Sequence, residues 1–355
     1  MAVAKYWAAF AFLALIPIGW RLGGAWTFLL VAALPLVLTA GDWLLGEERP
    51  AAPGAWAAHR LLPWLYIPLQ LAEIGWAGAM VARPSTTLLE AVGLTLSTGV
   101  ASGVFGFIAA HEMAHSRHAA ERLYALAMLA GMLDLPFAIS HVHGHHRRAA
   151  TYEDPASARR GESVYAFMLR SVAGQAREAW DFEAGRLTRL GRRALGLGNR
   201  MVLFALAEAA LVAVAAVFGP RVLAFFVGQA LLAIALLEAF NYIAHYGLSR
   251  RQMADGRLEP LRPIHSWSTR RRLNNRALFN MGRHADHHRF SARPYHELES
   301  LGGGAMLPCG YAGVLLMALI PPLWRRVMDP RVDAAMVDAA PDDPQAIGRT
   351  NAAAA

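Results

Sequence analysis

The sequence predicts an all-α integral membrane protein with about six transmembrane helices and a histidine-rich cap on the cytoplasmic face. This prediction depends on three observations: the composition, the number of long apolar stretches and the grouping of the histidines. The 355 residues are 55% hydrophobic and 17% charged, whereas about 25% of the residues in soluble domains are charged. A chain with so few charged residues cannot cover its whole surface with polar groups. Most of it is therefore not a soluble enzyme, and a bilayer is part of its solvent.

Six apolar stretches reach or approach the roughly 20 residues that a helix needs to cross a bilayer. They cover approximately residues 5–22, 25–45, 61–82, 88–110, 201–218 and 222–244. The first is not interpreted as a signal peptide, because no clear cleavage site follows and the apolar pattern resumes at Trp26. Short connections at residues 21–24, 83–87 and 219–221 join the stretches in pairs. We therefore expect three helical hairpins.

The distribution of basic residues predicts the orientation. Two long polar segments, residues 111–200 and 245–355, hold 13 and 15 of the 34 lysines and arginines, and the three short connections hold one each. Six spans put both segments on one face, and the positive-inside rule makes that face cytoplasmic. Both termini and all histidine groups are thus expected on the cytoplasmic side of a bacterial inner membrane. The same rule accounts for the net charge of +8, so we do not expect nucleic-acid binding.

The chain is expected to form a single membrane-embedded domain over residues 1–326. The apolar stretches 123–139 and 306–323 are too short to span comfortably and are expected to dip into the interface. Residues 327–355 are rich in Ala, Asp and Pro, which predicts a disordered C-terminal tail. The single cysteine, Cys309, excludes a disulfide framework, a cysteine-based zinc site and an iron–sulfur centre. Electrons for any redox reaction must therefore come from a partner.

Eleven of the fourteen histidines fall into four groups. The groups are His111 to His118, His141 to His146, His245 alone, and His284 to His288. The fourth apolar stretch leads into the first group and the sixth into the third, so both lie where a helix reaches the cytoplasmic face. Isolated histidines are more often interfacial or core residues, and we expect this of His59, His118, His143, His265 and His296.

The spacing within the first two groups is typical of metal ligands on helices. His111 and His115 stand at i and i+4 and share one helix face. His141 and His145 repeat that spacing. His146 is offset by roughly 100°, which is expected to let it reach a second metal. Neutral imidazoles of this kind bind iron, zinc or copper.

The last group, His284 to His288, adds more candidate ligands than one ion can bind. His284, His287 and His288 stand at i, i+3 and i+4, so they are expected to converge on one stripe. With His245 there are nine candidate nitrogens, and four or five already fill the surroundings of one ion. The sequence therefore predicts two metals. Zinc pairs usually share bridging carboxylates, which are sparse here, so redox metals are favoured.

These groups resemble the histidine boxes of the membrane-bound alkane monooxygenase family, non-haem di-iron hydroxylases related to the fatty-acid desaturases. The matching boxes are His111 to His115, His141 to His146, Asn241 to Gly247 and Arg283 to His288, with accessory matches at residues 153–159 and 265–267. The Asn-Tyr-x-x-His-Tyr-Gly box separates the hydroxylases from the desaturases. The similarity covers roughly residues 5–325.

The resemblance implies two iron ions in the cytoplasmic cap. The implied iron ligands are His111, His115, His141, His145, His146, His245, His284, His287 and His288. Glu112 and Asp154 are expected either to act as auxiliary ligands or to hold an imidazole in place. Asp286 is expected to fix an imidazole tautomer.

The activity implied by the resemblance is O2-dependent hydroxylation of medium-chain n-alkanes: R–CH3 + O2 + 2 e− + 2 H+ → R–CH2OH + H2O. An unactivated C–H bond offers nothing for acid–base catalysis, so a metal-derived oxidant is needed. A rubredoxin or ferredoxin with its NAD(P)H-dependent reductase is expected to supply the electrons. An acidic carrier of this type is expected to dock on basic residues. The candidates are Arg250, Arg251, Arg270, Arg271 and Arg272.

The resemblance also suggests which residue limits the length of the substrate. In the family, such a residue lies about two turns before an acidic residue at the cytoplasmic end of the second span. Asp42 matches that acidic residue, which puts the limiting position near Leu34. Eight residues of helix rise roughly 12 Å, a depth suited to a medium-length chain.

Three departures from the family pattern leave other activities open. The family carries a basic residue at the position of Ser116 and acidic residues at those of Ser140 and Ala244. The alternatives are a hydroxylase of alkyl-aromatic or terpene methyl groups, or a fatty-acid desaturase or hydroxylase of the same superfamily. A metal transporter is the alternative that is not an enzyme, and its ligands would lie at mid-membrane depth.

Overall fold

A computed structural model describes residues 4–48 and 56–338, and this part of the chain is built from helices and loops. The long apolar helices are α1 (Ala8–Leu22), η2 with α2 (Gly24–Phe28 and Leu29–Leu45), α3 (Trp56–Val81), α4 (Leu88–Ala101) continued by η3 and α5 (Ser102–Gly106 and Phe107–Ala114), α10 (Arg200–Val217) and α11 (Pro220–His245). All six expected stretches are therefore helical, and together they form the bundle.

Four of these helices are long and apolar enough to cross a membrane: Gly24–Leu45, Leu88–Ala114, Arg200–Val217 and Pro220–His245. Helix α1 is apolar but has only 15 residues. Helix α3 has 26 residues but carries buried Gln70 and Glu73, which make it less apolar. The described part of the chain is thus all-helical with four candidate membrane spans, and α1 and α3 are the two members of the expected six that are less clear.

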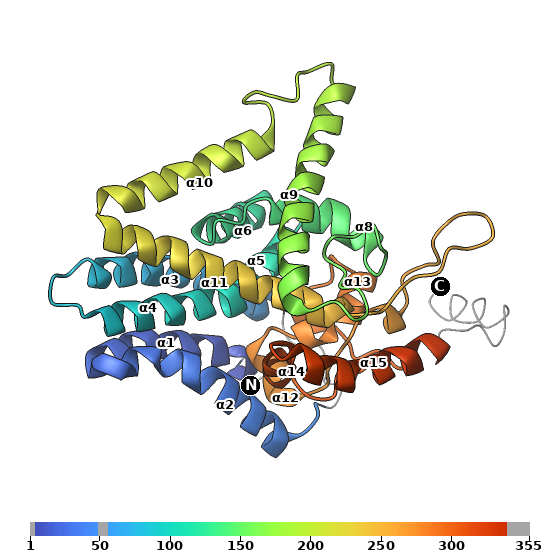
Figure 1. Cartoon of the computed structure of the whole chain (residues 1–355), viewed down its shortest axis with the longest axis horizontal. Helices are drawn as coiled ribbons and strands as arrows, with labels where there is room; N and C mark the ends of the chain where they lie inside the picture. The colour runs from blue at the N-terminus through green and yellow to red at the C-terminus, as the bar shows by residue number, and fades with distance from the viewer. Residues whose placement is uncertain (1–3, 49–55, 339–355) are drawn as a thin grey trace.

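Close contacts between backbones hold α4, η3 and α11 together. Figure 1 shows α3, α4 and α11 lying side by side along the long axis of the molecule. A Cβ added at Gly103 would lie only 2.6 Å from Ala233 Cα, so glycine is required for this approach. Small residues serve the same purpose wherever helices pack closely in membranes. The bundle is therefore tight around the segment that leads to His111.

A second set of helices and loops covers one end of the bundle, and we call it the cap. Its helices are α6 (Ala119–Gly131), α7 (Phe137–Ile139), η4 (Ser140–His145), α8 (His146–Arg148), α9 (Val164–Arg189), η5 (Pro263–His265), α12 (Arg272–Ala277), η6 (Met281–Arg283), α13 (His284–Arg289), η7 (Tyr295–Glu297), α14 (Tyr311–Ala318) and α15 (Pro321–Asp338). The stretch 123–139 forms most of α6 and the turn into α7, and 306–323 forms α14 and the start of α15.

Helix α15 (Pro321–Asp338) extends into the segment that was expected to be a disordered tail. Disorder was expected from residue 327, but residues 327–338 continue this helix. Met328 and Val332 are buried on its inner face, and Asp329 accepts a hydrogen bond of 2.7 Å from Tyr246. The composition suggested disorder because it does not reveal that these few apolar residues find a partner surface. The remainder of the expected tail, residues 339–355, lies outside the described residues.

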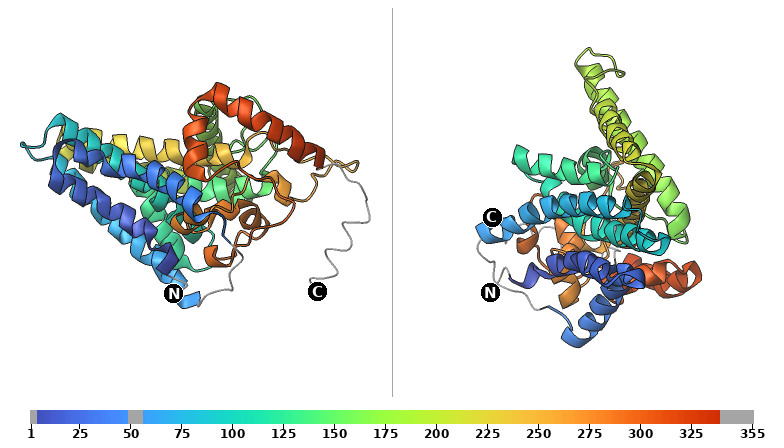
Figure 2. Two further views of the ribbon diagram at one scale, coloured as in Figure 1. Left: turned by 90° about the horizontal axis from the view of Figure 1, so that it is seen from below. Right: turned by 90° about the vertical axis from the view of Figure 1, so that its left-hand side faces the viewer.

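Helix α10 is the least covered part of the bundle. The right-hand view of Figure 2 shows α10 and the adjoining half of α9 standing away from the other helices. Only 6% of the apolar window of α10 is buried within the protein. Its apolar side chains therefore face lipid when the helix lies in a bilayer.

Candidate metal centre

Four segments bring nine histidines together where the bundle meets the cap. Helix α5 carries the first pair near its end, η4 and α8 carry the second group, α11 ends at His245, and α13 carries the last three. The nine side chains form two groups whose nitrogens lie within 4.8 Å of one another in each group. These are the same nine residues that the sequence singled out, and the other five histidines lie in neither group.

The first group contains five histidines: His111, His115, His141, His146 and His287. The Nε2 atom of His146 lies 3.0 Å from that of His141 and 3.2 Å from that of His287. The Nε2 atoms of His111 and His115 are buried and form no hydrogen bond within the described residues. One nitrogen from each of the five rings thus faces a common point.

The second group contains four histidines: His145, His245, His284 and His288. The Nε2 atom of His288 lies 3.2 Å from that of His145, 3.1 Å from that of His245 and 3.0 Å from that of His284. An ion bound by imidazoles at about 2.1 Å places neighbouring nitrogens roughly 3.0–3.4 Å apart. The spacing in this group therefore suits a bound metal.

The assignment of ligands to the two groups differs from the expectation in one respect. His146 was expected to leave His141 for a second metal, but it joins His141, and His145 joins the other group. The segment Ser140–His145 is a π-helix, and the backbone N–H of His146 bonds to the carbonyl of His141. In a π-helix residues i and i+5 are hydrogen-bonded neighbours, so His141 and His146 share a face. The sequence contains no strong signal that this segment is a π-helix and not an α-helix.

Helix α13 also divides its histidines. His284 and His288 belong to the four-histidine group and His287 to the five-histidine group, so the expected single stripe is wrong. Adjacent residues on a helix point about 100° apart, which lets His287 and His288 face different histidine groups. Helix α13 thereby links the two groups.

Five of the buried imidazoles are neutral at physiological pH. Burial, and after it the neighbouring imidazoles, hold the pKa values of His141, His146, His284, His287 and His288 well below their ordinary value. A neutral imidazole keeps a lone pair for a metal, whereas imidazolium has none. The donor set of each group therefore fits a nitrogen-binding transition metal.

Asp154 holds one ligand in place. His145 Nδ1 donates to Asp154 Oδ2 at 2.8 Å, and Ser157 Oγ donates to the same oxygen at 2.7 Å. Burial alone would raise the pKa of Asp154, but His145 and these hydrogen bonds lower it. The carboxylate therefore fixes the His145 tautomer that turns Nε2 toward the four-histidine group.

The two other carboxylates that the sequence singled out have different roles. Glu112 accepts a hydrogen bond of 3.0 Å from the backbone N–H of Tyr295, so it ties α5 to the loop after α13. Asp286 accepts from Arg293 Nη1 at 2.7 Å and from the backbone N–H of Glu299 at 2.9 Å. The expected contact between Asp286 and an imidazole is thus replaced by contacts that fold the following loop. Neither carboxylate belongs to a metal-binding group of the described residues.

Sequence reasoning missed the groups that support His245 and Ser140. His245 Nδ1 lies 3.2 Å from the carbonyl oxygen of His265, which orients the ring. Ser140 Oγ donates to Gln175, and Gln175 donates to Glu238 at 2.7 Å. A backbone acceptor has no sequence signature. Glu238 could have been noticed, because a carboxylate within an apolar helix needs a partner.

Leu34 lines an apolar cavity of about 180 Å³ between α2, α4, α11 and α14. Its side chain is 8% exposed, so it faces the protein interior and not lipid. Asp42, farther along α2, accepts a hydrogen bond of 3.0 Å from the backbone N–H of Asn274 and fixes α2 against α12. The position predicted to limit the substrate therefore lies in the wall of this apolar cavity.

The fold and the two histidine groups define a membrane-embedded metalloprotein whose ligands are imidazoles at the ends of its helices. The fatty acid desaturase family model matches residues 85–318. Alkane 1-monooxygenase 1 of Pseudomonas aeruginosa is 38% identical over 87% of this chain and 84% of its own length. Alkane 1-monooxygenase of Pseudomonas putida is 38% identical over 77% of this chain and 68% of its own length.

A relative with a different substrate in its name also aligns. The xylene/toluene monooxygenase hydroxylase component of Pseudomonas putida is 28% identical over 86% of this chain and 82% of its own length. The identity to the alkane 1-monooxygenases is higher and also extends over most of the chain. The chain belongs to the alkane 1-monooxygenase family, within the fatty acid desaturase superfamily.

Proposed function

We propose that this protein hydroxylates the terminal methyl group of medium-chain n-alkanes, using O2 and two electrons, at a pair of iron ions. The observation that carries the proposal is the arrangement of two imidazole-only groups beside an apolar cavity within a membrane bundle. The family relatives support the same reaction class. When bound, the irons supply the oxidant that an unactivated C–H bond requires.

The chain's own residues hold and shield this centre. Five and four imidazoles would hold one ion each, and Asp154 fixes the orientation of His145. The apolar cavity excludes water and aligns a hydrocarbon that arrives from the bilayer. Such a substrate partitions into lipid, which explains why the centre lies at the end of membrane helices.

Electrons reach the centre from a separate carrier, for which we propose an acidic rubredoxin or ferredoxin served by an NAD(P)H-dependent reductase. The described part of the chain has one cysteine, Cys309, so it holds no cysteine-bound cluster. Two of the five arginines expected at the docking face are partly engaged within the protein. Arg250 donates to the carbonyl oxygens of Glu259 and Arg147, and Arg272 donates to that of Glu47. Arg251, Arg270 and Arg271 are the remaining candidates for contact with the carrier.

The orientation in the membrane is part of the proposal. We place the cap and both termini in the cytoplasm and the connections at residues 83–87 and 219–221 on the opposite side of the bacterial inner membrane. The ends of α5 and α11 meet at adjacent histidine groups, which supports an arrangement with both ends on one face. It also argues against a metal transporter, whose ligands belong at mid-membrane depth.

A product analysis tests the function. Membranes that contain the protein and its electron carriers are supplied with a series of n-alkanes, with toluene and p-xylene as alternatives, and the alcohols are identified by mass spectrometry. We expect 1-alkanols from medium-chain substrates. Benzyl alcohols as the main products would instead favour the alkyl-aromatic activity named for the more distant relative. No alcohol from any substrate in iron-loaded membranes would contradict both.

A further inference from the structure

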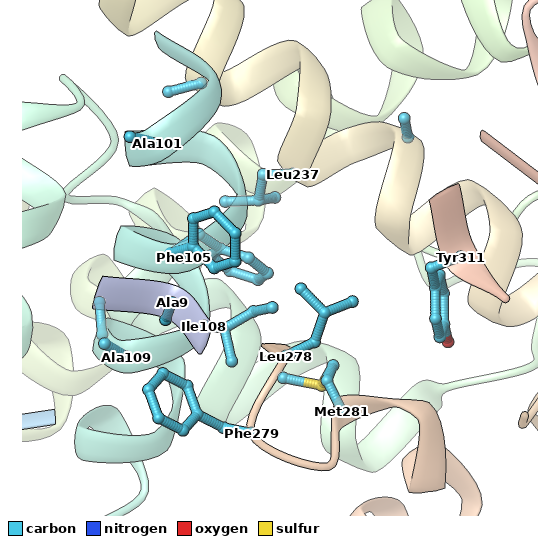
Figure 3. Close-up of a cluster of buried hydrophobic side chains, with 14 of the residues drawn as sticks. Ala9, Ala101, Phe105, Ile108, Ala109, Leu237, Leu278, Phe279, Met281 and Tyr311 are labelled. Atoms are coloured by element: carbon cyan, nitrogen blue, oxygen red, sulfur yellow. The ribbon is translucent and has the colours of Figure 1, made fainter. Parts of the chain in front are cut away.

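The inner wall of the apolar cavity contains an aromatic pair, Phe240 of α11 and Tyr311 of α14. The two rings are stacked, with centroids 4.0 Å apart and planes 10° apart. Both residues line the cavity, together with Leu34 and Leu316. Figure 3 shows Tyr311 at one side of a cluster of buried side chains that includes Leu278 and Leu237. The pair is therefore part of the surface that a hydrocarbon in this cavity would touch.

Phe240 also lies next to the metal-binding groups. Its ring centroid is 6.4 Å from that of His284, a member of the four-histidine group. It is 6.5 Å from the ring of Phe107, which in turn packs 5.8 Å from His111 of the other group. Along α11, Phe240 precedes His245 by about 7.5 Å of helix. A substrate that moves from the cavity toward either group thus passes this ring.

The pair is held rigidly. Tyr311 is 3% exposed, and its hydroxyl lies 3.5 Å from the carbonyl oxygen of Trp267. Gly310, at the start of α14, is packed so closely that an added Cβ would lie 2.2 Å from Asp42 and 2.6 Å from Asn274. Close packing of α14 at this point holds Tyr311 in place, and Phe240 would lose its stacking partner if it rotated away. Stacked rings of this kind gain about 0.5–1.5 kcal/mol beyond their buried area.

A rigid obstacle at this position has a chemical consequence. C–H bonds within an alkane chain are weaker than those of its terminal methyl group, so an unrestrained oxidant prefers the interior positions. Terminal hydroxylation therefore needs a steric cause. To present an interior methylene, an alkane must bend so that two arms of the chain lie abreast, which requires a wider passage than its end does.

We propose that the Phe240–Tyr311 pair admits only the end of an unbranched hydrocarbon to the metal centre and so determines which carbon is hydroxylated. The inference rests on the proposed function and adds the residues that set its regiochemistry. It assigns the pair a different task from that of Leu34, which is expected to limit chain length. The pair acts by shape, so Tyr311 needs its ring and not its hydroxyl.

The test measures the ratio of 1-octanol to 2-, 3- and 4-octanol formed from n-octane by the full chain in membranes with its electron carriers. We expect F240A and Y311A each to raise the share of internal alcohols about tenfold. F240L should have a smaller effect in the same direction, and Y311F should keep the terminal ratio. The matched control is F226A, because Phe226 lies on the same helix but lines a different apolar cavity. Its ratio should not change.

Iron content is measured for every variant. If F240A lacks iron, the milder F240L and the independent Y311A decide the question. The proposal is overturned if the iron-loaded variants F240L and Y311A both yield 1-octanol at the original ratio. It is also overturned if F226A shifts the ratio as strongly as F240A. Failure of the proposed function would look different, because the unaltered protein itself would then yield no octanol.

Discussion

At the scale of single residues, the two histidine groups make separate contributions to metal binding. His145→Ala removes a nitrogen from the four-histidine group, and His287→Ala removes one from the five-histidine group. We expect each change to lower the iron content below two per chain and to abolish turnover while the protein stays in the membrane. Metal analysis of purified protein, together with activity assays, checks this. If both variants kept full activity, the di-iron assignment would be wrong.

A matched control for these variants lies in the same segment. His143 belongs to neither group, and its ring stacks on Phe182 at 4.4 Å. His143→Ala should therefore keep both irons and most of the activity. His59 is less suitable, because it is buried on α3 and stacks on His296.

Asp154 gives a second prediction at this scale. Asp154→Asn keeps the size of the side chain but removes the charge that holds the proton on His145 Nδ1. Loss of such a partner typically costs 10–100-fold in metal affinity or activity. We expect weaker iron retention during dialysis against a chelator. Glu153→Gln, which alters the neighbouring carboxylate, serves as the control, and equal iron loss in the two variants would contradict the role of Asp154.

Much of the metal centre could be predicted at the scale of residues. The spacing of His111 and His115 directly indicates a shared helix face, and the resemblance to known boxes supplied the other ligands. The division between the groups could not be predicted, because it depends on the π-helical backbone around His141. The role of Asp286 was also missed, because sequence adjacency to histidines does not reveal that its carboxylate turns toward Arg293.

At the scale of elements, α2 contributes the cavity wall. Leu34→Trp should fill part of the cavity and shorten the longest alkane accepted, whereas Leu34→Ala should lengthen it. Leu36 lies two residues farther on the same helix and is 69% exposed, so Leu36→Ala should leave the range of chain lengths unchanged. Competition assays with mixed n-alkanes measure this range. Unchanged profiles in both Leu34 variants, with normal iron content, would show that Leu34 does not contact substrate.

The junction between α9 and α10 depends on a charged contact outside the spans. Glu183 accepts hydrogen bonds from Arg186 and Arg200 at 2.6–3.0 Å. Burial alone would raise the pKa of Glu183, but these bonds outweigh it and lower the pKa from 4.5 to about 2. The stabilisation is therefore fully present above pH 4.5 and is lost as the pH falls toward 2.

The lowered pKa of Glu183 predicts how the stability of the protein depends on pH. Glu183→Gln should lower the Tm of the detergent-solubilised protein at pH 7, and the difference from the unaltered protein should shrink as the pH falls below 4.5. Glu153→Gln, on the cap surface, is expected to cause no comparable change. A Tm difference that is the same at pH 7 and pH 3 would contradict an ionic role for Glu183.

At the scale of the whole molecule, the helices predicted from apolar stretches are all present, because long apolar runs have few other ways to satisfy their backbone in a bilayer. The extent of α15 was less accessible to prediction. Its burial depends on tertiary contacts such as that between Tyr246 and Asp329, and composition carries no trace of them. The sequence thus predicts elements that face lipid better than elements that pack on the cap.

The proposed topology makes the last prediction. Reporter fusions after residues 200 and 355 should both report the cytoplasm, and a fusion at Pro84 should report the periplasm. The chain must cross the membrane an even number of times between the end of α5 and the end of α11 if both helices are to end at one centre. A periplasmic signal after residue 200 would require a different path for α1 or α3, the two helices whose crossing is less clear from their length or composition.

The π-helical turn at Ser140–His145 makes the metal centre sensitive to the length of the chain as well as to its residues. Inserting one residue into this turn, for example directly after Val142, would place His146 six residues after His141 and would rotate all that follows by about 100°. His146 would then point away from His141, although no ligand had been replaced. Insertion of one residue in this short stretch should therefore be as damaging as the loss of a histidine. Deletion of Val142 would leave His141 and His146 at i and i+4 on one face of an ordinary α-helix, and exchanges of Val142 for similar residues should be tolerated.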